Sequence, residues 1–282
     1  MDNTFLDFYK ETVKNLKKNN IISAEIDAQI FFEFVTKKSR EFLLANPGYK
    51  LKKREIEKIK TMVKLRSKHY PVSYIVKKKE FFGLEFAISS DVLIPRPETE
   101  LIVEKALEFL KTKKKKVISV LDVGTGSGNI IISIAKNIYP NSQKIIFFAS
   151  DISEKALCIA RKNSKKHQTN INFIKSDLFT NIQGKFDLIV ANLPYVPEGG
   201  SENDEVGFEP KKAIFSGNDG TATIFRFLQE AERHINKNGQ ILIEADPRNI
   251  NKIQKYALKK YSNAKISYDL SGNPRLLSIL SK

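Results

Sequence analysis

Glycines in one short segment could bring a ligand close to the protein backbone. The run Gly124-Thr125-Gly126-Ser127-Gly128 follows an apolar segment that ends in Leu-Asp-Val, and a helical pattern follows it. Glycine permits a sharp turn and a close approach because it has no Cβ, and the start of a helix offers unpaired N–H groups. The run therefore predicts a binding loop, with a purely structural turn as the alternative.

Acidic residues stand at the ends of the next two apolar segments. Asp151 is placed to accept hydrogen bonds from both ribose hydroxyls of a bound nucleoside. Asp177 could accept the amino group of adenine, while Leu178 and Phe179 cover the ring. Each carboxylate could instead cap a helix. Because ligands of such sheets bind at the carboxyl ends of the strands, three consecutive strand ends of this kind favour a nucleoside site.

Two kinds of nucleoside-containing cofactor fit these residues, a dinucleotide and S-adenosyl-L-methionine. The glycine spacing is G-x-G-x-G, whereas dinucleotide sites have G-x-G-x-x-G, and the sequence shows no second phosphate-binding feature. S-adenosyl-L-methionine, with S-adenosyl-L-homocysteine as its product, is therefore favoured. The predicted cofactor-binding residues are Gly124, Thr125, Gly126, Ser127, Gly128, Asp151, Asp177, Leu178 and Asn192.

Apolar strand patterns alternate with helical patterns from residue 117 onward. Such alternation predicts an α/β fold with a mainly parallel, seven-stranded sheet that is covered on both faces. The last two strands are separated by residues 271–275 alone, too few for a parallel crossover, so the final strand should be antiparallel. That arrangement favours a class I, Rossmann-like methyltransferase. The expected strands are 117–123, 144–151, 171–177, 186–193, 240–246, 264–270 and 276–280.

The first 78 residues show helical periodicity and a strong positive charge. Ser23 is a plausible N-cap, and a Lys- and Arg-rich amphipathic helix is expected around 51–68. Residues 1–78 contain 18 Lys and Arg against 9 Asp and Glu, which is +9 of the net +16 of the chain. This excess suggests a docking face, although a solvated surface explains it equally well. We expect a helical substrate-docking domain at 1–78, a β-hairpin linker at 79–95 and the methyltransferase domain at 96–282.

The composition argues against several other classes of protein. A chain with 41% hydrophobic and 28% charged residues is typical of soluble globular proteins. No apolar run approaches the ~18 residues of a membrane helix, and the first ten residues lack the apolar core of a signal peptide. One cysteine, Cys158, and three scattered histidines predict no metal site. We expect a cytoplasmic enzyme without a membrane partner, for which nucleic acid contact is possible but not required.

The reacting groups are expected directly after the fourth strand, in Ala191-Asn192-Leu193-Pro194-Tyr195. This segment resembles the Asn-Pro-Pro-Tyr motif of methyltransferases that alkylate nitrogen atoms conjugated to a π-system. The resemblance implies that the Asn192 side-chain oxygen and a main-chain carbonyl each accept one N–H of a target amide. It also implies that Tyr195 flanks the target and helps to exclude water. The predicted catalytic residues are Asn192, Pro194 and Tyr195, and Leu193 joins them as a predicted substrate-binding residue.

Further segments resemble the HemK/PrmC-type peptide chain release factor N5-glutamine methyltransferases. The resemblance extends over roughly residues 70–282. It implies methyl transfer from S-adenosyl-L-methionine to the side-chain amide nitrogen (N5) of the glutamine in the Gly-Gly-Gln motif of a release factor. It also implies that the helical N-terminal domain helps to dock that factor. The segments are 71–75 with the following Phe-Gly, Val92-Leu-Ile-Pro-Arg-Pro-Glu-Thr-Glu100, Glu209-Pro210 through Gly217-Asn-Asp-Gly220, and Asp269-Leu-Ser-Gly-Asn-Pro-Arg275.

Two departures from the family pattern keep alternatives open. Leu193 replaces the first proline of the motif, and Asn-Leu-Pro-Tyr is the form in ribosomal RNA adenine dimethyltransferases. Glu244-Ala245-Asp246 stands where the family usually has Glu-Ile-Gly. The alternatives are an adenine-N6 methyltransferase acting on ribosomal RNA or DNA, a glutamine methyltransferase of a ribosomal protein, and a non-catalytic module that binds S-adenosylmethionine.

Overall fold

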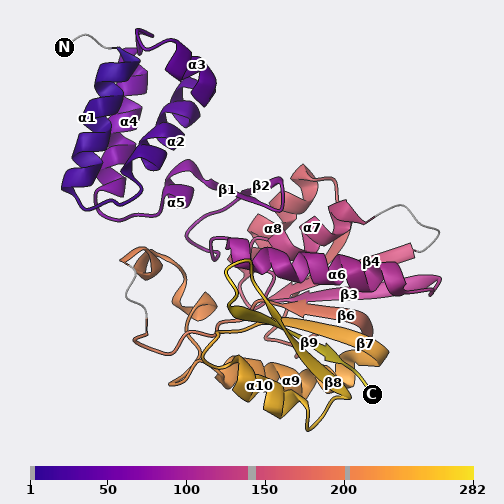
Figure 1. Ribbon diagram of the computed structural model, residues 1–282. Coiled ribbons are helices and arrows are strands. Elements are labelled where there is room, and N and C mark those ends of the chain that lie inside the picture. Colours follow the sequence, from indigo (N-terminus) through magenta and orange to yellow (C-terminus); the bar gives the residue numbers. More distant parts are fainter. Residues whose placement is uncertain (1–3, 139–143, 201–203) are drawn as a thin grey trace. The chain divides into compact units, whose positions relative to one another are not determined.

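The computed structural model describes residues 4–138, 144–200 and 204–282 (Figure 1). They group into two compact units. The first contains Met1–Lys77 and Asn203–Phe208, and the second contains Lys78–Glu202 and Glu209–Lys282. No helix in the described ranges is long and apolar enough to cross a membrane.

The first unit is a helical bundle with an aromatic core. Leu16, Phe31, Phe32 and Ile59 are fully buried in it, and the ring of Phe32 meets the edge of the Phe5 ring at 5.2 Å between centroids. The expected basic helix around 51–68 is observed as α4. The helices are α1 (Phe5–Lys18), α2 (Ala24–Thr36), α3 (Arg40–Ala45), α4 (Lys53–Arg66) and α5 (Val72–Val76), with the short 3-10 helix η2 (Asp204–Phe208).

A buried ion pair holds three segments of this first unit together. Arg66 Nε donates to Asp27 Oδ2 at 2.6 Å, and Arg66 Nη2 donates to Glu205 Oε1 at 2.7 Å. Ser23 occupies the N-cap position of α2, as the sequence predicts, but its side chain makes no capping hydrogen bond. Its hydroxyl donates instead to Asp27 Oδ2 at 2.9 Å. The Ser23 hydroxyl thus supports the carboxylate that neutralises Arg66.

The second unit begins with a β-hairpin, as the sequence predicts for this region. Strands β1 (Lys78–Phe81) and β2 (Leu84–Ala87) pair antiparallel. Phe82 and Gly83 between them both have positive φ, which is the conformation of a two-residue hairpin turn. The paired strands end at Ala87, so residues 88–95 lie outside the hairpin. A 3-10 turn, η1 (Pro97–Thr99), then leads into α6 (Glu100–Thr112).

The main sheet has seven strands in the order β5-β4-β3-β6-β7-β9-β8. β9 pairs antiparallel with both β7 and β8, which confirms the predicted direction of the final strand. β7 starts earlier than expected, at Ile235 in place of 240, and β6 ends earlier, at Ala191 in place of 193. The strands are β3 (Val117–Val123), β4 (Lys144–Asp151), β5 (Ile171–Lys175), β6 (Phe186–Ala191), β7 (Ile235–Glu244), β8 (Asn263–Tyr268) and β9 (Pro274–Leu280).

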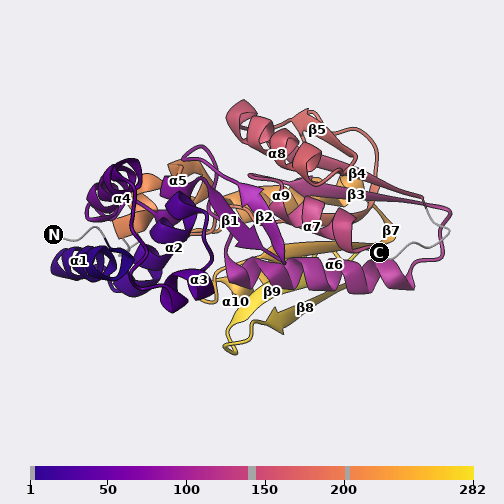
Figure 2. The ribbon, with the colours of Figure 1, turned by 90° about the horizontal axis from the view of Figure 1, so that it is seen from above.

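Helices cover both faces of the sheet, as Figures 1 and 2 show. On β3, Ile118 and Val120 point into a core shared with α6, α7 and the hairpin, whereas Leu121 and Val123 point into a core shared with α9 and α10. This alternation follows from the two-residue period of a strand. The helices are α7 (Asn129–Asn137), α8 (Glu154–Lys166), α9 (Ala222–His234) and α10 (Ile250–Ala257), and η3 (Lys211–Ala213) is a further 3-10 turn.

Candidate active site

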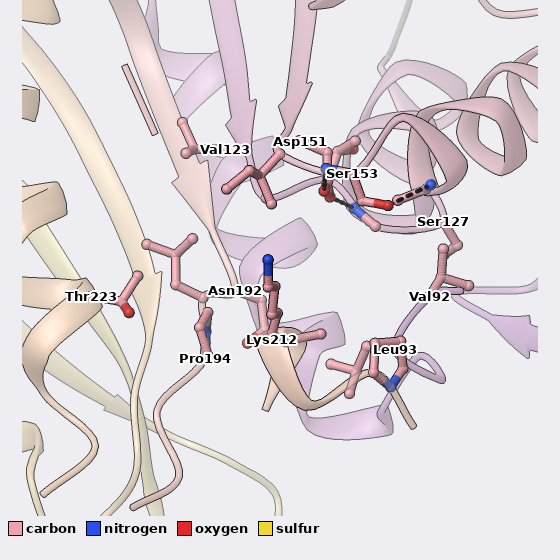
Figure 3. Close-up of a pocket in the computed structure, with 18 of the residues that line it drawn as sticks. Val92, Leu93, Val123, Ser127, Asp151, Ser153, Asn192, Pro194, Lys212 and Thr223 are labelled. Carbon is pink, nitrogen blue, oxygen red and sulfur yellow. Dashed lines mark hydrogen bonds between the residues drawn. The ribbon is translucent and has the colours of Figure 1, made fainter. Parts of the chain in front are cut away.

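A cavity of about 690 Å³ lies at the carboxyl ends of the parallel strands in the second unit. It collects residues from loops that are far apart in the sequence, and Figure 3 shows Val123, Asp151 and Asn192 around one hollow with Val92 and Leu93 on its other side. Ten residues predicted from the sequence line it. They are Gly124, Thr125, Gly126, Ser127, Asp151, Asp177, Leu178, Asn192, Leu193 and Pro194.

The glycine loop is held from behind by a buried asparagine. Asn163 of α8 is fully buried, and its Nδ2 donates to the carbonyl of Ser127 at 2.8 Å and to that of Ala87 at 2.9 Å. Its Oδ1 accepts the N–H of Ala87 at 2.8 Å. One side chain therefore ties the hairpin to the loop, and the backbone of the loop is fixed before any ligand arrives.

Gly128 has a different role from the other glycines of the loop. It is not among the residues lining the cavity. It is the N-cap of α7 with φ +81°, and a Cβ built on it would lie 2.9 Å from Ile132 Cδ1 and 3.3 Å from Ala160 Cβ. This glycine permits the close packing of α7 against α8, which is the role of the last glycine in nucleotide-binding turns.

Asp151 lies at the end of β4 and is linked to the glycine loop. Its Oδ2 accepts the N–H of Gly126 at 2.9 Å, and its Oδ1 accepts the N–H of Ser153 at 2.9 Å. Burial raises the pKa of Asp151, and the backbone hydrogen bonds from Ser153 and Gly126 oppose this rise. A carboxylate has about four lone-pair sites, so both oxygens can still accept hydroxyl protons from the cavity.

Asp177 also lines the cavity but is already paired with a cation. Arg226 of α9, itself a lining residue, donates to Asp177 Oδ1. The following residue, Leu178, is buried with φ +45°, an uncommon conformation for a residue with a Cβ. The hydroxyl of Ser176 donates to the Leu178 carbonyl at 2.9 Å and supports this turn. The strained turn presents both the carboxylate and the apolar side chain to one wall of the cavity.

A third carboxyl group lies beneath the glycine loop. Asp122 is fully buried in β3, and its Oδ2 accepts the hydroxyl of Thr125 at 2.7 Å. Burial raises the pKa of Asp122 to about 7, and the nearby charge of Asp151 adds to this rise while the Thr125 hydrogen bond opposes it. The sequence analysis overlooked Asp122 because an acidic residue inside a strand gives no motif of its own.

Asn192 stands at the end of β6, beside the cavity. Its Nδ2 donates to the hydroxyl oxygen of Thr99 at 3.0 Å. Leu193 is buried, and a Cβ on Gly124 would lie 3.0 Å from Leu193 Cδ2, so the two loops pack directly on each other. The motif and the glycine loop therefore form adjacent walls of the same cavity.

Tyr195 is placed differently from the sequence-based expectation. It does not line the cavity, and its hydroxyl donates to Glu244 Oε1 at 2.9 Å. Burial and the neighbouring Glu244 raise the pKa of Tyr195, and burial likewise raises the pKa of Glu244. The Tyr195 hydroxyl therefore supports the loop through Glu244, and the place of its ring beside a target group stays a prediction.

Glu209 supports the cavity wall, although nothing in the sequence singled it out for this role. Glu209 is buried, accepts the N–H of Ile94 at 3.0 Å and pairs with Arg96. It thereby fixes the segment that carries Val92 and Leu93 to the cavity wall. The segments 92–100 and 209–210 were noted as a resemblance, but nothing in their spacing indicated that they meet.

Comparisons with known proteins agree with this geometry. A family model described as a methyltransferase domain matches residues 113–268, and one described as the PrmC N-terminal domain matches residues 7–76. The release factor glutamine methyltransferase of Buchnera aphidicola is 35% identical, covering 92% of this chain and 93% of that protein. The release factor glutamine methyltransferase of Clostridium botulinum is 38% identical, covering 81% of this chain and 82% of that protein.

A solved structure shows the same fold at low sequence identity. It is a 16S rRNA methyltransferase of T. thermophilus in complex with AdoMet and guanosine, with a TM-score of 0.53 and 15% identity over 73% of this chain and 50% of that chain. Together with the sheet order and the cavity at the strand ends, this likeness defines a class I, Rossmann-like methyltransferase. At 35% and 38% identity over most of its length, the chain belongs to the release factor glutamine methyltransferase family.

Proposed function

We propose that this protein transfers a methyl group from S-adenosyl-L-methionine to the side-chain amide nitrogen (N5) of the glutamine in the Gly-Gly-Gln motif of a peptide chain release factor. The names of its relatives support this substrate. The observation that carries the proposal is the orientation of Asn192. Its Nδ2 is engaged by Thr99, which leaves Oδ1 as the acceptor beside the cavity.

The proposed cofactor fits the residues that surround the cavity. The glycine loop, the Asp151 carboxylate and the turn at Asp177-Leu178 would hold its amino acid, ribose and adenine parts. Leu178 and Leu193 supply apolar surface for the ring and the methyl-bearing part. When bound, S-adenosyl-L-methionine supplies an electrophilic methyl group on a positively charged sulfur.

The residues of the motif would act on the target by orientation. An amide nitrogen is a poor nucleophile because its lone pair is delocalised into the carbonyl. Asn192 Oδ1 and a main-chain carbonyl of the 192–194 turn would each accept one N–H of the target, which aims the nitrogen lone pair at the methyl group. Orientation of this kind can lower a barrier by roughly 7–11 kcal/mol, so no strong base is required.

The helical unit is proposed to dock the release factor. Its net charge of +9 over residues 1–78 attracts acidic surfaces. Residues 79–95 would then act as the linker, and residues 96–282 as the catalytic domain. Because release factors act in translation, we place this activity in the cytoplasm.

The proposal is tested by methyl transfer from labelled cofactor to three acceptors. These are a release factor, the same factor with its Gly-Gly-Gln glutamine changed to alanine, and ribosomal RNA. We expect label in the unmodified factor alone. Leu193 and the net charge of +16 make RNA the second candidate, and label in RNA alone would replace the proposal with an adenine-N6 methyltransferase. Label in both forms of the factor would move the target to another residue.

A further inference from the structure

Thr99 carries a hydroxyl that its own helix does not use. It occupies the N-cap position of α6, where threonine normally accepts a hydrogen bond from the first turn, but it makes no such bond. The residue is 1% exposed. A buried hydroxyl without a partner is costly, so its partners indicate its purpose. They are Asn192, 93 positions away in the sequence, and the carboxyl group of Glu244.

The bond between Thr99 and Asn192 has a defined direction. The Nδ2 of asparagine only donates, so the Thr99 oxygen accepts, at 3.0 Å. The terminal torsion of an asparagine side chain is broad and nearly two-fold, so an unrestrained amide can present either its oxygen or its nitrogen. A hydroxyl can donate as well as accept, but the Thr99 hydroxyl also bonds to Glu244, where it is the donor. Its oxygen is therefore left to accept, which favours the Asn192 rotamer whose nitrogen faces α6.

The orientation of this amide matters for the reaction. In the favoured rotamer Oδ1 is available to accept an N–H of the target. In the flipped rotamer Nδ2 would face the target NH₂, and two donors would oppose each other. The hydroxyl of Thr99 also lowers the pKa of Glu244 by hydrogen bonding, as does the phenol of Tyr195. Thr99 and Glu244 therefore form a buried hydrogen-bonded group that contacts both Asn192 and Tyr195 of the motif.

We propose that Thr99 is a positioning residue for methyl transfer, which fixes the Asn192 amide so that its oxygen faces the target nitrogen. The inference rests on the proposed function for its reaction, but its structural content is independent of the substrate. Under this inference the Ile-Pro-Arg-Pro-Glu-Thr-Glu segment, residues 94–100, orients the side chain of Asn192. Glu209 fixes the beginning of that segment through Ile94 and Arg96, and Thr99 extends the connection to the motif.

The kinetic test compares Thr99→Val, which removes the hydroxyl at nearly constant shape, with Thr99→Ser, which keeps it. A small misplacement of reacting groups can cost about 100-fold in rate, so kcat of Thr99→Val should fall by about 10- to 100-fold. KM for the release factor and Kd for S-adenosyl-L-methionine should change little, and Thr99→Ser should retain most of the rate. Thr169→Val is the control, because the Thr169 hydroxyl bonds to Ser164 away from the cavity.

A double-mutant cycle tests whether Thr99 acts through Asn192. In single turnovers with excess enzyme, Thr99→Val should cost nothing further in an Asn192→Ala background, because coupled residues are not additive. Equal losses in both backgrounds would overturn the inference. So would a wild-type rate in Thr99→Val.

A spectroscopic readout separates this inference from the proposed function. In ¹⁵N-labelled protein, the side-chain amide signals of Asn192, assigned with Asn192→Ala, should shift and exchange faster with solvent in Thr99→Val but not in Thr169→Val. Unchanged Asn192 signals would overturn the inference whatever the substrate is. A wild-type enzyme that leaves the release factor unlabelled would overturn the proposed function while the amide signals still decide the role of Thr99.

Discussion

The hydroxyl of Tyr195 donates a hydrogen bond to Glu244 Oε1 at 2.9 Å, and this bond joins the loop after β6 to the end of β7. Glu244 is 2% exposed. Burial raises its pKa, and the hydrogen bonds from Thr99 and Tyr195 oppose the rise. The tyrosine of the motif thus stabilises a buried carboxyl group, and through it the loop that carries Asn192.

Tyr195→Phe removes the hydroxyl but keeps the ring, and it should destabilise the protein. Leaving a buried acceptor without its donor costs about 1–3 kcal/mol, so the free energy of unfolding in urea should fall by that amount. Glu244→Gln is the matched comparison, because its amide oxygen can still accept from Tyr195. An unchanged free energy of unfolding for Tyr195→Phe would mean that the bond contributes nothing.

Asn192→Ala should abolish methyl transfer under multiple turnover, so that only single turnovers with excess enzyme detect a residual rate, and it should leave cofactor binding nearly intact. The side chain is proposed to hold the target amide, whereas the cofactor is held mainly by the glycine loop and Asp151. Labelled methyl transfer measures the first property, and calorimetric titration with S-adenosyl-L-homocysteine measures the second. Equal losses of both would reject the role assigned to Asn192.

Asp151→Ala should weaken cofactor binding. Hydrogen bonds to charged groups are worth about 1.5–3 kcal/mol each, so losing the ribose contacts should raise Kd for S-adenosyl-L-homocysteine by at least about tenfold. Asp151→Asn keeps one acceptor oxygen and should show a smaller loss. If Asp151→Ala binds as tightly as the wild type, the ribose is held by other residues.

Asp122→Asn should remove a pH dependence of stability. The folded carboxyl keeps its proton up to a pKa of about 7, whereas in the unfolded chain it loses that proton near its ordinary value of 3.8. The folded state therefore binds more protons between these values, and its stability falls as the pH rises through that window. The free energy of unfolding of Asp122→Asn relative to wild type should rise from pH 4 to pH 7 and then level off. Parallel curves would show that Asp122 titrates normally.

Gly220→Ala should disturb the loop that carries the motif. Gly220 has φ +78°, and a Cβ on it would lie 2.1 Å from the main-chain oxygen of Tyr195. Gly272→Ala is the control, since Gly272 has φ +80° but no atom within 4 Å of the added Cβ. Both variants carry the cost of a left-handed alanine, about 1–2 kcal/mol. Gly220→Ala should lose more stability than Gly272→Ala and should also lose methyl transfer. Equal effects of the two variants would contradict the inference that the contact of Gly220 with the Tyr195 main chain holds the loop that carries the motif.

The strands of the second unit and the direction of the last one could be predicted from the sequence, whereas their order in the sheet could not. Strand patterns and the five-residue connection at 271–275 predicted seven strands with an antiparallel last one, because side-chain periodicity and connection length are local properties. The glycine loop and Asp151 were also predicted from the sequence, and Asn192 from a resemblance to a known motif, and all of them line one cavity. Each follows a strand of one parallel sheet, and the carboxyl ends of such strands meet at one edge.

The residues that support these groups could be identified only from the folded chain. Thr99 and Asn192, Asn163 and Ser127, and Tyr195 and Glu244 are each far apart along the chain. A hydrogen bond between distant segments leaves no periodicity or spacing in the sequence, because it depends on how helices and loops pack in three dimensions. For the same reason the sequence did not show that Tyr195, which was expected at the cavity, is not among its lining residues.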